Sequence, residues 1–227
     1  MLLNFAILSF LLFSIFLLSQ NLQKYISLFF YLLIGNKKIS SSLLVIILLP
    51  GTIIHELSHL IMALILRVHT GELTIMPKFG ENGEILAGSL EIGNTDPFRR
   101  TLIGLAPIIV GLALIFFLNN LIGQIGLNWS NWTNLIIYYL FFTVSTSMFS
   151  SKKDLESLVI AGPIMVVLVY ILYNFGVRIT LSENLIQTLN PIIVKLNWGL
   201  LKAGILDLLI FSIIRIPVFF LRKALKN

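Results

Sequence analysis

The chain has 227 residues, 57% hydrophobic and 11% charged, whereas a soluble domain carries roughly 25% charged residues and a disordered chain is poor in apolar ones. Both classes are therefore excluded, and the length is better divided into membrane crossings of about 20 apolar residues each. The absence of cysteine excludes disulfide scaffolds, zinc ribbons and thiolate nucleophiles, and the net charge of +6 comes from Lys and Arg scattered at helix ends, which indicates flanks that face lipid headgroups rather than nucleic acid.

The first part of the chain contains three apolar segments. Residues 2–19 are almost wholly apolar, with no basic residue before them and no A-x-A-like site after them, so a retained membrane helix is favoured over a signal peptide. Residues 25–34 are too short to cross a bilayer alone, and we expect them to lie at the interface, to re-enter the membrane or to prolong the first helix. Residues 43–66 predict the second membrane helix.

A polar stretch at 70–93 separates the second and third membrane helices. It is rich in glycine and in β-forming residues, and Gly80-Glu81-Asn82-Gly83 stands at its centre. This pattern predicts two short strands joined by a turn. Because an open sheet edge cannot face lipid, the hairpin is expected in water or in a cleft lined by protein.

Four more apolar segments complete the chain. Asp96-Pro97 before the first of them predicts a helix start, with an acidic cap and proline in the first turn. Gly104 and Pro107 inside it predict a bend or a close backbone approach. The last segment, which is interrupted by charged residues, either crosses the membrane or lies on its surface. The four segments are 101–118, 133–148, 155–175 and 198–221.

The predicted fold class is an all-α polytopic membrane protein with about six membrane helices and a small β-hairpin between helices two and three. We divide the chain into an N-terminal membrane helix and interfacial segment at 1–42, a catalytic core at 43–165 and C-terminal helices with a basic tail at 166–227. The loop at 119–132 lacks Lys and Arg, whereas the loop at 67–100 contains four of them and the C-terminal tail is basic. We expect a multi-pass protein of a prokaryotic cell membrane, and the charge asymmetry predicts that its active site faces the cytoplasm. The lysines at 24, 37 and 38 disagree, because they fall on the side assigned as outside.

The strongest chemical signal is His55-Glu56-Leu57-Ser58-His59 in the second apolar segment. Residues four apart share one face of a helix, so both imidazoles can reach one metal ion. Glu56 then lies beside the metal, where it can deprotonate a water molecule. Ionisable residues inside a membrane helix indicate function, and a polar cluster that merely joins helices would not require this spacing. The pattern predicts zinc ligation by His55 and His59, with Glu56 as general base.

A catalytic zinc site usually takes three protein ligands, so a third must come from elsewhere. Asp154 follows the fourth membrane helix, which runs in the same direction as the second, and the serine-rich run at 145–151 favours an early end of that helix. We therefore favour Asp154. Glu156 and the hairpin carboxylates remain alternatives, and His69 is geometrically awkward. The hairpin carboxylates are Glu72, Glu84 and Glu91.

Over about residues 43–165 the chain resembles the site-2 protease family of intramembrane zinc metalloproteases. The resemblance rests on the His-Glu-Leu-Ser-His pattern, on Ile103-Gly104-Leu105-Ala106-Pro107 in the third helix, on an aspartate after the fourth helix and on the hairpin. It implies a three-helix core, zinc held by His55, His59 and Asp154, and cleavage of membrane-spanning protein substrates near the cytoplasmic side. Asp154 departs from the family pattern, because Lys153 precedes it, Leu155 follows it and no Asn-Pro stands upstream.

Three other classes of function are considered. A membrane metalloenzyme could act on a lipid or prenyl substrate, a transporter could bind a cation in its helix bundle, and a degenerate scaffold could keep the fold without activity. Glu56 argues against the scaffold, because a binding site needs no base, and the lack of internal repeats argues against a transporter. The predicted reaction is therefore peptide hydrolysis, in which the hairpin could hold an unwound substrate by strand addition.

Overall fold

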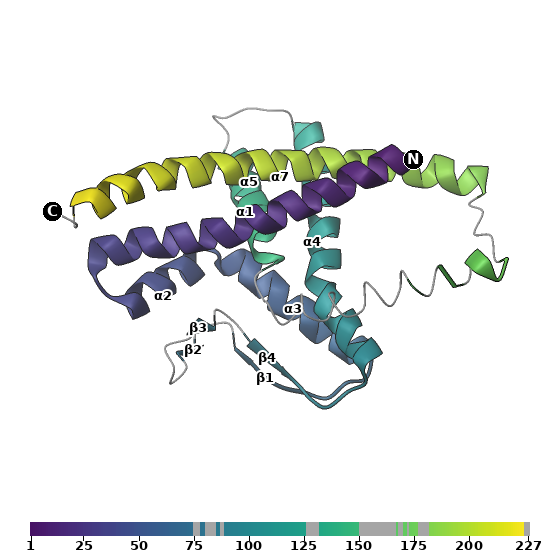
Figure 1. The fold of residues 1–227 in the computed structure, drawn as a ribbon, viewed down its shortest axis with the longest axis horizontal. Coiled ribbons are helices and arrows are strands. Elements are labelled where there is room, and N and C mark those ends of the chain that lie inside the picture. Colours follow the sequence, from purple (N-terminus) through teal and green to yellow (C-terminus); the bar gives the residue numbers. More distant parts are fainter. Residues whose placement is uncertain are drawn as a thin grey trace.

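A computed structural model describes residues 1–74, 78–79, 85–86, 89–125, 132–149, 167, 170–171, 173–176 and 182–224. The fold is mostly helical with a small β-hairpin, as the sequence predicts (Figure 1). Most of the predicted helix at 155–175 lies outside the described residues. The elements are α1 (Leu2–Ile34), α2 (Lys37–Ile47), α3 (Leu49–Ile65), β1 (Thr70–Thr74), β2 (Lys78–Phe79), β3 (Ile85–Leu86), β4 (Ser89–Ile92), α4 (Pro97–Ile125), α5 (Trp132–Ser147) and α7 (Glu183–Ala224).

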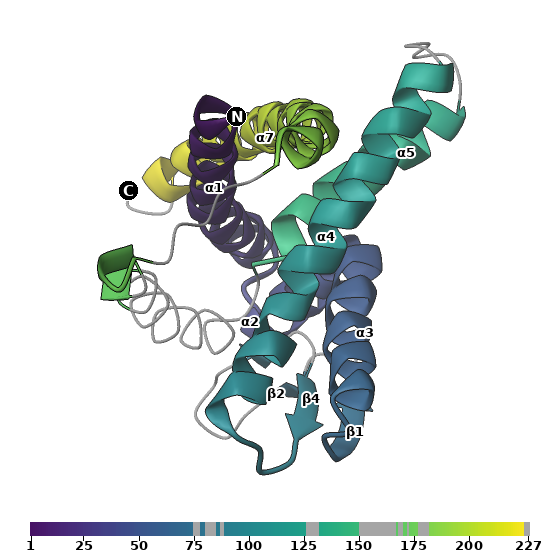
Figure 2. The ribbon, with the colours of Figure 1, turned by 90° about the vertical axis from the view of Figure 1, so that its right-hand side faces the viewer.

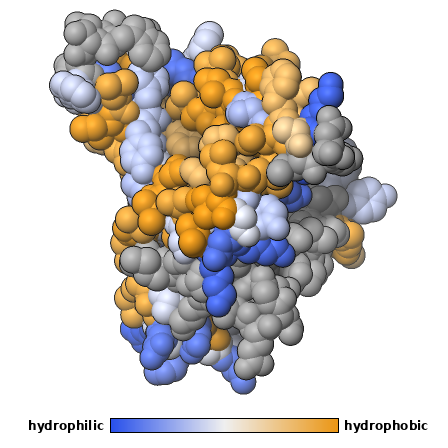
Figure 3. Space-filling model, turned by 90° about the vertical axis from the view of Figure 1, so that its left-hand side faces the viewer, coloured by the Kyte–Doolittle hydropathy of each residue, from blue (hydrophilic) through white to orange (hydrophobic). Residues whose placement is uncertain are grey.

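The apolar helices indicate a membrane protein. Among the described residues, α1, α4 and α7 are long and apolar enough to cross a bilayer, and α2 with α3 adds a fourth candidate if that bent pair is taken as one span. Apolar side chains also gather over much of the surface shown in Figure 3. The structure thus supports three or four spans in the described part of the chain, against the six predicted for the whole of it.

Helices α1 and α7 run parallel and side by side (Figures 1 and 2). Asn4 near the start of α1 donates from Nδ2 to Asn190 Oδ1 at 2.7 Å, and Tyr25 near its end stacks edge-on against Phe211, with the ring centroids 5.1 Å apart. Residues 25–34 prolong the first helix, which was one of the three predicted outcomes. Helix α7 starts 15 residues before the predicted segment and has 42 residues, about 63 Å, so it exceeds the hydrocarbon thickness roughly twofold.

The second predicted helix is broken. The prediction of one helix over 43–66 is wrong, because α2 and α3 meet at Leu48 at an angle of 77°. Pro50 favours the break, since its ring clashes with the preceding turn of a helix and it lacks the N–H that would bond to the residue-46 carbonyl. The end of α2 is then completed by another helix, because the Tyr139 hydroxyl on α5 donates to the Ile47 carbonyl at 2.8 Å.

Gly51 in the first turn of α3 allows α5 to approach closely. A Cβ atom at this position would lie 2.1 Å from the Thr143 carbonyl oxygen and 2.6 Å from Ser147 Oγ. Both distances are far shorter than a van der Waals contact, and the backbone oxygen cannot rotate away. The two helices can therefore pack at this distance only because residue 51 has no side chain.

We expect Gly51→Ala to lower the free energy of unfolding by at least about 1–3 kcal/mol, because the added methyl group forces α3 and α5 apart. Gly204→Ala in α7 is the matched control, since a Cβ atom there would meet Ile15 Cγ1 at an ordinary 3.7 Å. That control should be neutral or stabilising by up to about 1 kcal/mol. Thermal unfolding in detergent measures both variants, and equal behaviour of the two would contradict the close packing.

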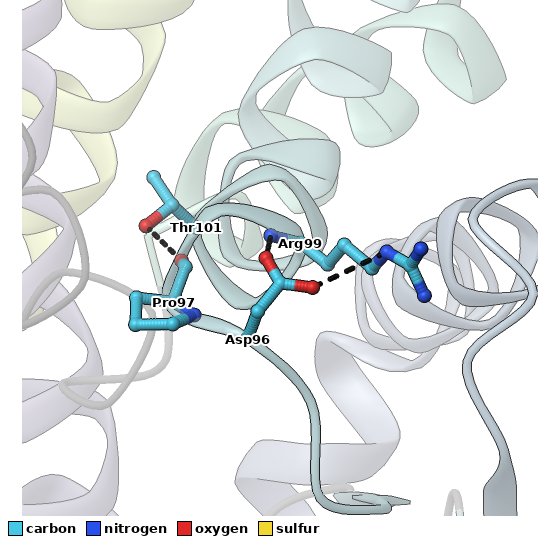
Figure 4. A network of polar contacts seen from close by, with 4 residues as sticks. All are labelled: Asp96, Pro97, Arg99 and Thr101. Carbon is cyan, nitrogen blue, oxygen red and sulfur yellow. Dashed lines mark hydrogen bonds and ion pairs between the residues drawn. The ribbon is translucent and has the colours of Figure 1, made fainter.

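Helix α4 begins where the sequence predicts. The Asp96 carboxylate accepts the Arg99 backbone N–H at 3.0 Å and pairs with Arg99 Nε at 3.2 Å. Pro97 occupies the first helical position, and its carbonyl accepts the Thr101 hydroxyl at 2.8 Å (Figure 4). The predicted acidic cap is thus confirmed. The helix continues through Pro107 to Ile125, beyond the predicted end.

The predicted hairpin is confirmed for the described residues. Strands β1 and β4 pair antiparallel, as do β2 and β3. Its base packs below α3 and α4, where Val68 and Ile103 are buried and the Ile92 side chain of β4 packs against them (Figure 2). The hairpin is therefore attached to α3, which carries His55 and His59, and to α4, which packs against α3.

Candidate metal centre

His55 and His59 meet on one face of α3, as their spacing predicts. The two side chains are buried, at 3% and 5% exposure. Their Nε2 atoms are 3.2 Å apart, and the rings stand nearly perpendicular with centroids 4.8 Å apart. The imidazole nitrogens thus point at one place rather than into separate surroundings.

The separation of the two Nε2 atoms fits a shared zinc ion. Zinc binds imidazole nitrogen at about 2.0–2.1 Å in tetrahedral geometry, which places two such nitrogens roughly 3.3–3.4 Å apart. The observed 3.2 Å is close to this value. A donor set of two neutral imidazoles is also the chemistry that zinc prefers among these residue types. The two histidines therefore fit the ion that the sequence predicts.

A backbone carbonyl of α4 orients the second imidazole. His59 Nδ1 lies 2.8 Å from the Ile103 carbonyl oxygen. Because a carbonyl only accepts, Nδ1 must carry the hydrogen in this contact, and Nε2 of the neutral ring keeps its lone pair. A histidine that donates its other ring N–H to a carbonyl is the usual arrangement for a metal ligand.

Glu56 is buried beside the histidines, at 6% exposure. A carboxylate in an apolar interior is costly unless it is compensated, so a buried glutamate next to two imidazoles indicates a functional rather than a solvent-facing role. Ser58 is also buried, but its hydroxyl donates to the Ile54 carbonyl of the same helix. Of the two, Glu56 is the residue suited to proton transfer.

The end of α5 lies beside the stripe of α3 that carries the histidines. Gly51, His55 and His59 are spaced four apart and so share one face of α3, and Ser147 lies against Gly51. Residues 141–149 are all buried, so α5 ends inside the protein, as the serine-rich run predicts. Ser147 at the end of α5 thus lies beside Gly51, which is about one helical turn from His55.

Two glutamines of α1 complete the end of α5. Gln23 Nε2 donates to the Thr146 carbonyl at 2.8 Å, and Gln20 Nε2 donates to the Phe149 carbonyl at 2.7 Å. The last carbonyls of a helix have no partner within the helix, and in an apolar interior such groups are costly. The glutamines remove this cost and hold the end of α5 against α1.

The third ligand is not placed by the structure. Asp154, Glu156 and Glu84 lie outside the described residues. Glu72, Glu91 and His69 are described and are exposed, whereas His55 and His59 are buried. Within the described ranges, no group of three His, Cys, Asp or Glu side chains converges on one point.

Sequence reasoning gave Asp207 no role beyond interrupting an apolar segment. Asp207 on α7 is fully buried, and Ser145 Oγ on α5 lies 2.9 and 3.1 Å from its two carboxyl oxygens. An acidic residue within an apolar helix is itself a signal of an interior polar contact. Together with the glutamines, this contact joins the end of α5 to both α1 and α7.

The structural site thus consists of two converged imidazoles, a buried glutamate and the nearby end of α5. Comparisons with protein-family models, with curated proteins and with solved structures found no match for this chain.

Proposed function

We propose that this protein is an intramembrane zinc metalloprotease that hydrolyses peptide bonds of membrane-spanning substrates. The observation that supports this most directly is the 3.2 Å separation of the His55 and His59 Nε2 atoms. Glu56, which follows His55 in the sequence, is also buried. The resemblance to site-2 proteases over residues 43–165 adds the reaction class.

Each residue of the site has a defined task in this proposal. His55, His59 and Asp154 would hold zinc, which when bound acidifies a water molecule and polarises the scissile carbonyl. Glu56 takes a proton from the attacking water and returns it to the leaving amine. The Ile103 carbonyl keeps the His59 ring in the tautomer and orientation that ligation needs.

The surroundings of the site favour a membrane-spanning protein as substrate. The two imidazoles are buried within an apolar helical protein, and a membrane-spanning substrate would share the apolar surroundings of these helices. A helix hides its peptide bonds in hydrogen bonds, so the substrate must unwind locally before hydrolysis. The hairpin packed beneath α3 and α4 could receive the unwound segment by strand addition.

Metal removal tests the proposal. We expect the purified protein in liposomes to cleave at least one member of a panel of single-span model substrates, to lose cleavage on treatment with a zinc chelator and to regain it when zinc is restored. The metal is required because Glu56 alone leaves the attacking water weakly acidic. Mass spectrometry locates the cut. Cleavage that persists without metal would refute a zinc enzyme, and turnover of a lipid or prenyl substrate in place of peptides would refute the protease.

A further inference from the structure

The carbonyl that holds His59 is the one that Pro107 leaves free. In an α-helix the N–H of residue 107 bonds to the carbonyl of residue 103. Residue 107 is proline inside α4, so it has no N–H to donate. The Ile103 carbonyl instead accepts from His59 Nδ1 at 2.8 Å.

The Ile103 carbonyl lies where it needs a hydrogen-bond donor from outside its own helix. Ile103 is fully buried where α4 packs against α3, so water is excluded as a partner, and an unsatisfied carbonyl there would be costly. A neighbouring helix is the remaining source of a donor, as in membrane helices that contain proline. The His59 imidazole on α3 supplies this donor, and the hydrogen bond in turn orients the ring.

We propose that Pro107 is a positioning residue of the metal site. By withholding a helical N–H, it reserves the Ile103 carbonyl for His59 Nδ1, which directs the Nε2 lone pair toward His55. The inference rests on the proposed function, because it assigns Pro107 a role in zinc binding. It requires no contact between Pro107 and the metal.

Pro107→Ala tests this directly. Alanine restores the N–H, which competes for the Ile103 carbonyl, and we expect zinc to bind about 10–100-fold more weakly, the usual loss when the partner of a metal-ligating histidine is removed. Alanine is also the better helix former, so the melting temperature of the metal-free protein should stay equal or rise. Weaker zinc binding without lower stability is not what a damaged fold would give.

Pro217→Ala is the matched control, because Pro217 is likewise inside a helix, in α7, which lacks the proposed ligands. That variant should bind zinc as the wild type does. Zinc affinity is measured by competition with a chelating dye on the full-length protein in detergent. Equal affinity of wild type and Pro107→Ala would overturn the inference and leave the proposed function standing, whereas a wild type that binds no zinc would refute the proposed function itself.

Nitrogen NMR of the metal-free protein provides a second measurement, which holds even if Pro107→Ala is unstable. The wild-type spectrum should show His59 in the neutral form protonated at Nδ1, and a spectrum showing Nε2 protonation would overturn the inference. In Pro107→Ala, we expect the Nδ1–H signal of His59 to weaken. A variant that binds zinc poorly but keeps the wild-type signal would also overturn it, because the loss would then have another cause.

Discussion

Glu56→Gln is expected to retain one zinc ion per chain while peptide hydrolysis falls by at least about 10²–10⁴-fold, the usual contribution of a general base. Glutamine has nearly the same size and keeps the buried position, but it cannot accept a proton from the attacking water. The measurement combines zinc content by atomic absorption with the rate of substrate cleavage in liposomes. Loss of cleavage with zinc retained would identify Glu56 as a base, whereas loss of both would identify it as a ligand.

Glu183→Gln provides the control for this substitution, because Glu183 is exposed in the first turn of α7. It makes the same chemical change far from the histidines and should leave both readouts unchanged. If Glu56→Gln loses zinc along with activity, then Glu56 belongs to the ligand set instead. Full activity of Glu56→Gln would remove the basis for the proposed mechanism.

His55→Ala is expected to abolish stoichiometric zinc binding and all cleavage. The variant leaves His59 as the only imidazole of the pair, and two ligands hold zinc far less tightly than three. The removed ring also leaves a cavity in the buried face of α3, so a modest loss of stability should accompany the loss of metal. Zinc content after dialysis and cleavage of the model substrate check the two expectations.

His69→Ala separates this effect from a general loss of histidine. His69 lies exposed after α3, and the variant should keep one zinc ion and full activity. Retention of a full equivalent of zinc by His55→Ala would show that the metal is held elsewhere. Loss of zinc in His69→Ala would bring that residue into the ligand set.

The local features of the site followed from the sequence because they depend on spacing within one element. Histidines four residues apart must share a helix face, and Asp96-Pro97 carries its own cap chemistry, so both predictions held. The hairpin was equally local, since glycine and β-forming residues define it over 24 positions. The break at Leu48 was also readable in principle, because Pro50 favours a helix start over a helix interior, but the apolar composition of the segment outweighed this signal.

Contacts between distant segments could not be read in this way. Nothing in the residues near Gln20 and Gln23 shows that they complete the end of α5, and Asp207 has its partner 62 positions away. The Ile103 carbonyl is a backbone group, which no side-chain motif reports. These pairings arise from the packing of whole helices, so the polar residues signal only that a partner is needed.

The contact at Gly51 has a mechanical consequence. Because the α3 backbone lies directly against the Thr143 carbonyl and the Ser147 side chain at Gly51, the two helices have little room to slide past each other there. In the proposed protease, an opening that admits a substrate to the histidines would therefore form elsewhere, at the hairpin or along the outer helices α1 and α7.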